Sequence, residues 1–123
     1  MQKTEHIWMD GQLVPWEQAQ VHVLTHTLHY GLGVFEGIRY YEDADGRPAI
    51  FRLLEHTERL FASAHIVGLE IPFTPDQINA ACVDTVRVNG LKAGYLRPLV
   101  FLGDGEMGLA AANRVRVAVI TWP

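Results

Sequence analysis

The 123-residue sequence contains a single cysteine, Cys82, which excludes an internal disulfide and fits a reducing compartment. It has 10 Lys and Arg residues against 14 Asp and Glu, and this formal net charge of −4 argues against nucleic acid as a partner. No segment approaches the ~18 apolar residues of a membrane span, and the first residues lack the apolar region of a signal peptide. These absences predict a soluble, cytoplasmic protein with no membrane association.

The composition, with 49% hydrophobic and 20% charged residues, is typical of a globular domain. A chain of this length buries roughly two-thirds of its unfolded surface, so it forms a core without disulfides or structural metals. The sequence contains no internal repeat, low-complexity run or Pro/Gly/Ser-rich linker. Residues 1–123 are therefore expected to form one domain. Because the sequence stops directly after a strand-like run, we expect this domain to be part of a longer protein.

Alternating and apolar runs separated by turn residues predict several strands. The Asp10-Gly11 pair supplies the positive φ angles of a type I′ turn, so it predicts a hairpin between segments 7–9 and 12–14. A second hairpin around Asp45-Gly46 is expected to join Val34–Tyr41 to Ala49–Phe51. Two later apolar runs are the remaining strand candidates: Tyr95–Leu102 and Val115–Ile120.

Two helices lie between these groups of strands. Apolar residues recur at helical spacing from Leu53 to about Val67. Thr74, Pro75 and Gln77 form a capping-box sequence that begins a second helix, and Asn89-Gly90 ends it. The expected buried face of the second helix consists of Ile78, Ala81, Cys82 and Val86. The order of elements predicts an α+β fold, a mostly antiparallel sheet with two helices packed on it.

Three patterns resemble functional sites, but for each of them a purely structural interpretation is favoured. The segment 103–108 matches G-x-G-x-x-G, but no acidic residue follows it, and we interpret it as a tight glycine loop rather than a dinucleotide site. His22, His26 and His29 would share one face of a helix, yet the β-branched residues around them favour an extended or irregular path and ordinary hydrogen bonds. Cys82 lies on a buried helix face, which argues against a cysteine nucleophile. We expect no metal site.

Two strand segments carry aromatic and basic side chains on one face. Alternation places Phe35, Gly37, Arg39 and Tyr41 on one side of their strand, with Val34, Glu36, Ile38 and Tyr40 on the other. Tyr95 and Arg97 repeat this arrangement two residues apart. Together the two faces could bind a small acid. The pattern also fits half-exposed sheet residues, and the residues alone leave both interpretations open.

The first helix carries a polar stripe opposite its apolar face, formed by Arg52, His56, Arg59 and Ser63. The stripe is either a solvated face or an anchor for a phosphate, whose oxygens suit the rigid donor fork of arginine.

The order of these motifs resembles the branched-chain amino-acid aminotransferases, class IV, fold-type IV enzymes that use pyridoxal 5′-phosphate (PLP). The resemblance extends along almost the whole chain, and the segment HYGLGVFEGIR at 29–39 is its most specific part. The motifs that carry it are His26–Arg39, Phe51-Arg52, Glu55-His56, Arg59-Leu60, Tyr95–Pro98 and Gly103–Gly108.

The resemblance implies a role for each matching residue. Arg59 would clamp the PLP phosphate. In the substrate pocket, Tyr95 would lie near the α-carboxylate, Arg97 would pair with the distal carboxylate of glutamate, and Arg39 would orient Tyr95. The remaining implied pocket residues are Phe35 and Tyr30 as apolar walls, Gly37 as a space beside the substrate, and Met107, Gly108 and Leu109 in a loop that closes over the pocket of a second subunit.

The resemblance also implies that residues 1–123 are the smaller, N-terminal domain of such an enzyme. The Schiff-base lysine of the family lies in a larger C-terminal domain, and neither Lys3 nor Lys92 matches it, so this chain has no catalytic residue of its own. The implied reaction is transfer of the amino group of leucine, isoleucine or valine to 2-oxoglutarate in a homodimer or larger oligomer. Alternatives are a D-amino-acid aminotransferase or aminodeoxychorismate lyase of the same fold, or a non-catalytic binding module.

Overall fold

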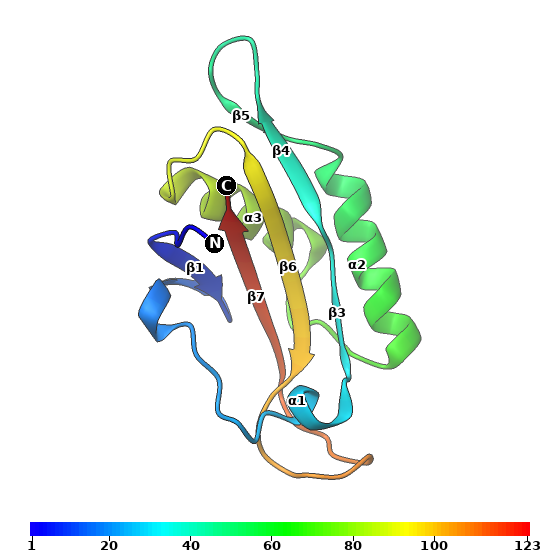
Figure 1. Cartoon of the computed structure of the whole chain (residues 1–123). Coiled ribbons are helices and arrows are strands. Elements are labelled where there is room, and N and C mark those ends of the chain that lie inside the picture. Colours follow the sequence, from blue (N-terminus) through cyan, green and yellow to red (C-terminus); the bar gives the residue numbers. More distant parts are fainter.

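The computed structural model describes all 123 residues, Met1–Pro123. It consists of one sheet with two long helices against one of its faces (Figure 1). The elements in chain order are β1 His6–Met9, β2 Gln12–Pro15, η1 Trp16–Gln18, α1 His26–Tyr30, β3 Gly33–Phe35, β4 Ile38–Glu42, β5 Pro48–Ile50, α2 Leu53–Val67, α3 Pro75–Val88, β6 Gly94–Leu102 and β7 Val115–Trp122.

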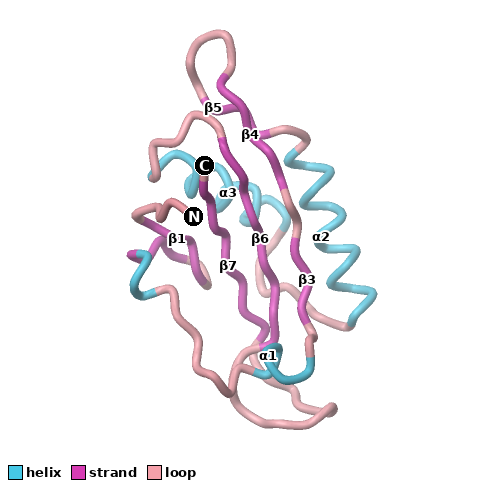
Figure 2. Tube along the Cα trace, in the orientation of Figure 1, coloured by secondary structure: helices cyan, strands magenta, loops and turns pink.

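The sheet has the strand order β2-β1-β7-β6-β4-β5, and β3 also pairs with β6 (Figure 2). Every paired set of strands is antiparallel. The long β6 strand is central, because it joins β7 on one side to both β3 and β4 on the other. The predicted α+β class with an antiparallel sheet is therefore confirmed.

The hydrophobic core lies between the sheet and helices α2 and α3. Alternate residues of the strands point into it, and both helices contribute their apolar faces. None of the helices combines the length and apolar character needed to cross a membrane. The core residues are Trp8, Ile38, Tyr40, Leu60, Ala64, Leu69, Ile78, Ala81, Cys82, Val86, Leu96, Val100, Leu102, Val117 and Val119.

Both long helices, α2 Leu53–Val67 and α3 Pro75–Val88, have the boundaries predicted from the sequence. In the capping box of α3, the Thr74 hydroxyl accepts from the Gln77 amide (3.2 Å) and the Gln77 side chain accepts from the Thr74 amide (2.8 Å). Gly68 ends α2 in a left-handed conformation with φ 79°. The predicted buried face of α3 is confirmed, since Ile78, Ala81, Cys82 and Val86 are all buried.

The hairpin at Asp10-Gly11 is also confirmed, with φ angles of 51° and 107° at the two turn residues. The strand expected over Val34–Tyr41 is instead divided into β3 and β4. The pairs Phe35–Leu99 and Ile38–Leu96 keep one register, which places Glu36 opposite Pro98. The Glu36 amide donates to the Pro98 carbonyl (3.0 Å), but proline has no amide hydrogen to return the bond, so the ladder is interrupted there.

The extended or irregular path expected around the three histidines is wrong for residues 26–30, which form the short helix α1. Gly31 ends this helix with φ 72° and donates to the Thr27 carbonyl. The Thr27 hydroxyl bonds to the carbonyls of Leu32 and Leu102, and the His26 amide donates to Gly103. The contacts to the distant residues Leu102 and Gly103 override the weak helical propensity of the segment.

The face of the sheet opposite the helices is partly covered by the chain between β2 and β3. Residues 19–28 cross it and leave a cavity of about 250 Å³ whose lining is almost wholly apolar. This segment buries Ile7, Met9 and Phe101, and the half of the face around Phe35 and Arg39 remains open. The candidate site lies at that open half.

We expect Thr74→Ala to lower the free energy of unfolding by about 1 kcal/mol, because it removes the acceptor of the α3 capping box. Urea denaturation followed by circular dichroism measures this loss. Thr74→Ser is the matched control, since it keeps the hydroxyl and is expected to retain most of the stability. Equal losses in the two variants would contradict a capping role.

Candidate functional site: an arginine–glutamate cluster and an aromatic cluster

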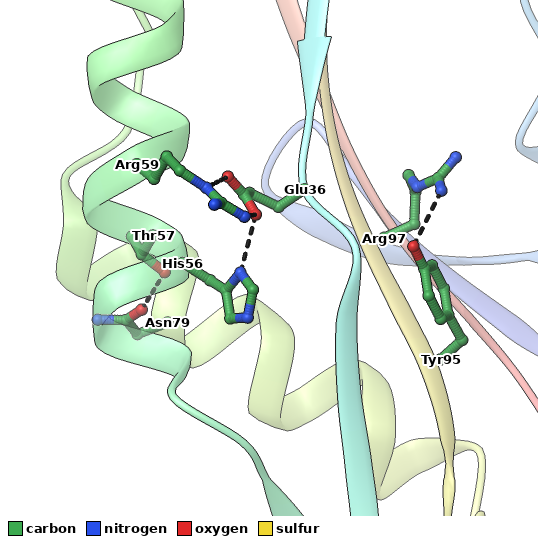
Figure 3. A network of polar contacts seen from close by, with 7 residues as sticks. All are labelled: Glu36, His56, Thr57, Arg59, Asn79, Tyr95 and Arg97. Carbon is green, nitrogen blue, oxygen red and sulfur yellow. Dashed lines mark hydrogen bonds and ion pairs between the residues drawn. The ribbon is translucent and has the colours of Figure 1, made fainter.

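Glu36, His56 and Arg59 form a compact polar group between β3 and α2, here called the arginine–glutamate cluster (Figure 3). The Glu36 carboxylate is 4% exposed and accepts from Arg59 Nε (2.7 Å) and Nη2 (2.9 Å). His56 Nδ1 donates to the same carboxylate at 2.8 Å. Arg59 remains 68% exposed, so its remaining donor hydrogens are available to an anion.

The environment of Glu36 favours its charged form. The two hydrogen bonds from Arg59 hold the pKa of Glu36 below its ordinary value of 4.5, although burial opposes them, and the His56 hydrogen bond also lowers it. The same contacts raise the pKa of Arg59. The cluster therefore contains a carboxylate and a guanidinium that are both charged at neutral pH.

A second group, here called the aromatic cluster, consists of Phe35, Tyr95, Arg97 and Trp122. The Arg97 guanidinium carbon lies 4.2 Å from the Phe35 ring centre and 5.4 Å from that of Tyr95. Arg97 Nη2 donates to the Tyr95 hydroxyl at 3.2 Å. Tyr95 is stacked on Trp122, with ring centres 4.9 Å apart. A positive charge is thus fixed among aromatic surfaces, an arrangement that suits an acid with an apolar portion.

Gly37 is required by the position of Tyr95. A Cβ atom at residue 37 would overlap the Tyr95 hydroxyl and lie 2.8 Å from its Cζ. The space at Gly37, expected beside a substrate, is therefore occupied in this structure by the phenol itself. Arg39, the cross-strand neighbour of Tyr95, has its guanidinium carbon 5.9 Å from the Tyr95 ring centre.

The two clusters lie on opposite sides of the segment that joins β3 to β4 (Figure 3). Phe35 and Glu36 are consecutive, and strand alternation sends their side chains to the two faces of the sheet. Glu36 thus points toward α2, whereas Phe35 meets Arg97 on the open face. A ligand that contacts both clusters therefore has to extend past this segment.

The predicted polar stripe on α2 lies at the surface, and three of its side chains form ion pairs or hydrogen bonds with carboxylates. Arg52 pairs with Glu55 at 3.0 Å, while His56 and Arg59 are engaged by Glu36. Together with Phe51, these residues line a hollow of about 310 Å³. Its position beside Arg59 fits the alternative interpretation, an anchor for a phosphate group.

The remaining predicted pocket residues gather around His26. Its Nε2–H donates to the Gly108 carbonyl at 2.8 Å, and its ring lies 4.4 Å from the Tyr30 ring. In the same loop, Met107 is partly exposed and Leu109 is 90% exposed. The structure therefore brings Tyr30 and the 107–109 segment together, but it does not pack them against the aromatic cluster.

The ordinary interpretations of the other motifs are confirmed. The 103–108 segment is a loop after β6, braced by the Asn113 side chain at Gly103 and Glu106. All three histidines bond to backbone groups: His22 Nδ1 accepts from the Leu24 amide, and His26 and His29 donate to carbonyls. Burial raises the pKa of the Cys82 thiol to about 12, which disfavours the nucleophilic thiolate form at neutral pH. Separately, no group of three His, Cys, Asp or Glu side chains is arranged to hold a metal ion.

Comparison with known proteins identifies the family. Residues 33–123, the part that holds both clusters, match the family model described as amino-transferase class IV. The chain belongs to the class IV aminotransferases. It is 54% identical over 117 residues to the branched-chain-amino-acid aminotransferase of Pseudomonas aeruginosa and 46% identical over 124 residues to that of Escherichia coli.

The two alignments cover 94% and 98% of this class IV aminotransferase chain, but only 38% and 40% of the two relatives. Solved structures agree in fold. The Escherichia coli branched-chain amino acid aminotransferase superposes with a TM-score of 0.93 at 42% identity, over 98% of this chain and 40% of that one. The Thermoproteus uzoniensis enzyme with norvaline gives 0.91 at 41% identity, over 98% of this chain and 41% of that one.

For two members of the clusters, Glu36 and Trp122, no functional role is predicted from the sequence. The signal for Glu36 is its position, because it is an acidic residue on a strand face otherwise formed by Val34, Ile38 and Tyr40. A charge on a core-facing position needs a partner of opposite sign. No comparable signal marks Trp122, whose stacking on Tyr95 depends on the pairing of β6 with β7.

We expect Gly37→Ala to destabilise the class IV aminotransferase chain by about 1–3 kcal/mol, because the new methyl group overpacks against the Tyr95 phenol. The added cost should largely disappear in a Tyr95→Ala background. Urea denaturation of the wild type, both single variants and the double variant gives the coupling. Additive losses would contradict the proposed contact.

The lowered pKa of Glu36 predicts a pH-dependent contribution to stability. This contribution is fully present above pH 4.5, the ordinary pKa of the unfolded state, and is lost as the pH falls through the lower pKa of the folded state. The difference in unfolding free energy between wild type and Glu36→Gln should therefore shrink below pH 4.5. In an Arg59→Ala background this pH dependence should weaken, since Arg59 is its largest cause. A difference independent of pH in both backgrounds would contradict the assignment.

Proposed function

We propose that residues 1–123 form the N-terminal domain of a PLP-dependent branched-chain amino-acid aminotransferase, and that a larger C-terminal domain completes the enzyme. The chain spans only about 40% of its branched-chain relatives. Neither of its two lysines matches the Schiff-base lysine of the family: Lys92 pairs with Glu42 at 3.0 Å, and Lys3 precedes β1. The chain alone is accordingly expected to be inactive.

The contact between Phe35 and Arg97 is the observation that carries this proposal. A transaminase of this type must accept both a branched apolar side chain and the distal carboxylate of glutamate in one pocket. An arginine whose guanidinium lies 4.2 Å from an aromatic ring offers a positive charge and an apolar surface at one place. Arg97 Nε is buried without a hydrogen-bond partner, which leaves a donor for an anionic group.

The residues present also fit PLP. Arg59 has donors left over from Glu36, and the hollow beside it is lined by further polar side chains. Among similar solved structures, one branched-chain amino acid aminotransferase is complexed with N-(5′-phosphopyridoxyl)-L-glutamate in one structure and with pyridoxamine 5′-phosphate in another. When bound, PLP supplies an electron sink for the carbanion formed at the substrate α-carbon. Arg59 would hold its phosphate, and the aromatic cluster would orient the substrate.

The other pocket residues are proposed to act as follows. Tyr95 lies near the α-carboxylate of the substrate, and Arg39 supports Tyr95 from the neighbouring strand. Phe35 forms an apolar wall, and Gly37 leaves the space that lets Tyr95 approach. A similar branched-chain aminotransferase has been solved in complex with 4-methylvaleric acid, a branched carboxylic acid, and this supports substrates of this class.

We further propose that the enzyme is a homodimer in the cytoplasm. Leu109 and Met107 are apolar residues at the surface, and Tyr30 lies nearby through its contact with His26. An exposed apolar loop of this kind is stabilised by packing against a second subunit. In this proposal Tyr30, Met107, Gly108 and Leu109 complete the pocket of the neighbouring protomer. The single cysteine, buried and reduced, fits the cytoplasm.

Arg97→Ala tests the substrate assignment in the full-length protein. The variant should lose about tenfold to a hundredfold in kcat/KM for glutamate and 2-oxoglutarate, because a charge-assisted contact with the distal carboxylate is removed. Leucine has no such carboxylate and should be affected far less. Single-turnover absorbance of each half-reaction measures both values.

Arg87→Ala is the control for this experiment, since Arg87 is an exposed arginine of α3 paired only with Asp84. It should leave both half-reactions unchanged. If Arg97→Ala lowers kcat/KM equally for leucine and glutamate while PLP is still bound, Arg97 does not bind the distal carboxylate.

A further inference from the structure

The Glu36 carboxylate determines where the Arg59 guanidinium lies. Both Nε and Nη2 of Arg59 donate to it, at 2.7 and 2.9 Å, in the paired geometry that fixes the plane of a guanidinium. Nη1 forms no hydrogen bond within the chain. Because Arg59 is 68% exposed, packing against other side chains contributes little to holding the guanidinium in place. The donors that remain therefore point in a direction set by one carboxylate.

Glu36 is itself held rigidly. It is 4% exposed, its backbone amide is bonded to Pro98 of the central β6 strand, and its second oxygen also accepts from His56. His56 and Arg59 are three residues apart on α2, so they present their donors from the same face of the helix. The carboxylate is thereby fixed to the sheet by its backbone and to the helix by two side chains.

Two effects of Glu36 on an anion at Arg59 oppose each other. Its negative charge weakens the field of the guanidinium, whereas its hydrogen bonds remove the rotamer freedom that a long exposed side chain would lose on binding. A free arginine side chain has many rotamers, and fixing them on binding costs entropy. Both carboxylate oxygens already accept hydrogen bonds from Arg59 and His56, and this moderates the repulsion. Preorganisation is expected to prevail.

We infer that Glu36 is a positioning residue for phosphate recognition: it holds Arg59, with His56 as its second support, in the orientation that receives the phosphate of the cofactor. This inference rests on the proposed function, in which Arg59 contacts that phosphate. Glu36 itself does not contact the ligand. It contributes to cofactor binding only through Arg59, and this dependence makes the inference testable.

The test compares binding of PLP with binding of pyridoxal, which lacks the phosphate, to the full-length protein. The preference for PLP, taken as the dissociation constant of pyridoxal divided by that of PLP, isolates phosphate recognition, since a general loss of structure would weaken both ligands. Glu36→Gln should reduce this ratio by about tenfold, the loss expected for one charge-assisted hydrogen bond, and leave pyridoxal binding unchanged. In an Arg59→Ala background Glu36→Gln should have no further effect on the ratio.

Asp10→Asn is the matched control. Asp10 is another poorly exposed carboxylate that binds an arginine, Arg116, at 2.7 Å, but it belongs to the β1–β2 turn. This variant should leave the ratio unchanged. Glu36→Asp provides a second test if Glu36→Gln folds poorly, because it keeps the charge but is one methylene too short for the same geometry. The Arg59 Nε–H resonance in NMR spectra should lose its hydrogen-bonded shift in both Glu36 variants.

The outcomes distinguish a failure of the proposed role of Arg59 from a failure of the inference about Glu36. A ratio unchanged in Arg59→Ala would overturn the phosphate role of Arg59 and with it the proposed site. A ratio reduced in Arg59→Ala but unchanged in Glu36→Gln would overturn the inference about Glu36 alone. A higher ratio in Glu36→Gln would also overturn it, by showing that the negative charge of Glu36 weakens phosphate binding more than its hydrogen bonds help.

Discussion

The alternation of side chains at Phe35, Glu36 and Gly37 is the constraint on which both parts of the site depend. Consecutive strand residues must point to opposite faces of a sheet. Phe35 therefore joins the aromatic cluster on the open face, and Glu36 enters the layer between the sheet and α2. A shift of one residue in the register would exchange the two faces and destroy both clusters at once.

The register is set by β6, which contributes to both sides of this segment. Its Pro98 accepts a hydrogen bond from Glu36 but returns none, and the interruption lies between β3 and β4. The neighbouring β6 residue Arg97 packs on Phe35, and Tyr95 fills the space left by Gly37. One strand thus places the residues of the aromatic cluster and fixes the backbone of the carboxylate that anchors Arg59.

Burying Glu36 is costly, and the structure offsets this cost locally. An uncompensated buried carboxylate is strongly unfavourable. Here three hydrogen bonds from two cationic or polar side chains satisfy it, and one partner, Arg59, stays largely in solvent. The pair therefore contributes less to stability than a fully buried ion pair would suggest, while it gives the exposed guanidinium a defined direction.

The sequence by itself determined the features that depend on near neighbours. The capping box at Thr74, the Asp10-Gly11 turn and the apolar periodicity of α2 each act within a few residues, and all three appear as predicted. The division of strand residues between two faces also follows from local geometry. The family resemblance pointed to the site residues, because their motifs keep their order along the chain.

Only the tertiary structure decided which distant groups meet. The split between β3 and β4 depends on Pro98, the α1 helix depends on contacts of Thr27 and His26 with Leu102 and Gly103, and Glu36 finds its partner 23 residues later in Arg59. None of these pairs leaves a signal in local propensity, since the free energy comes from hydrogen bonds made after the sheet and helices have packed. The direction of the Arg59 guanidinium belongs to this second class, because it depends on a carboxylate supplied by another element.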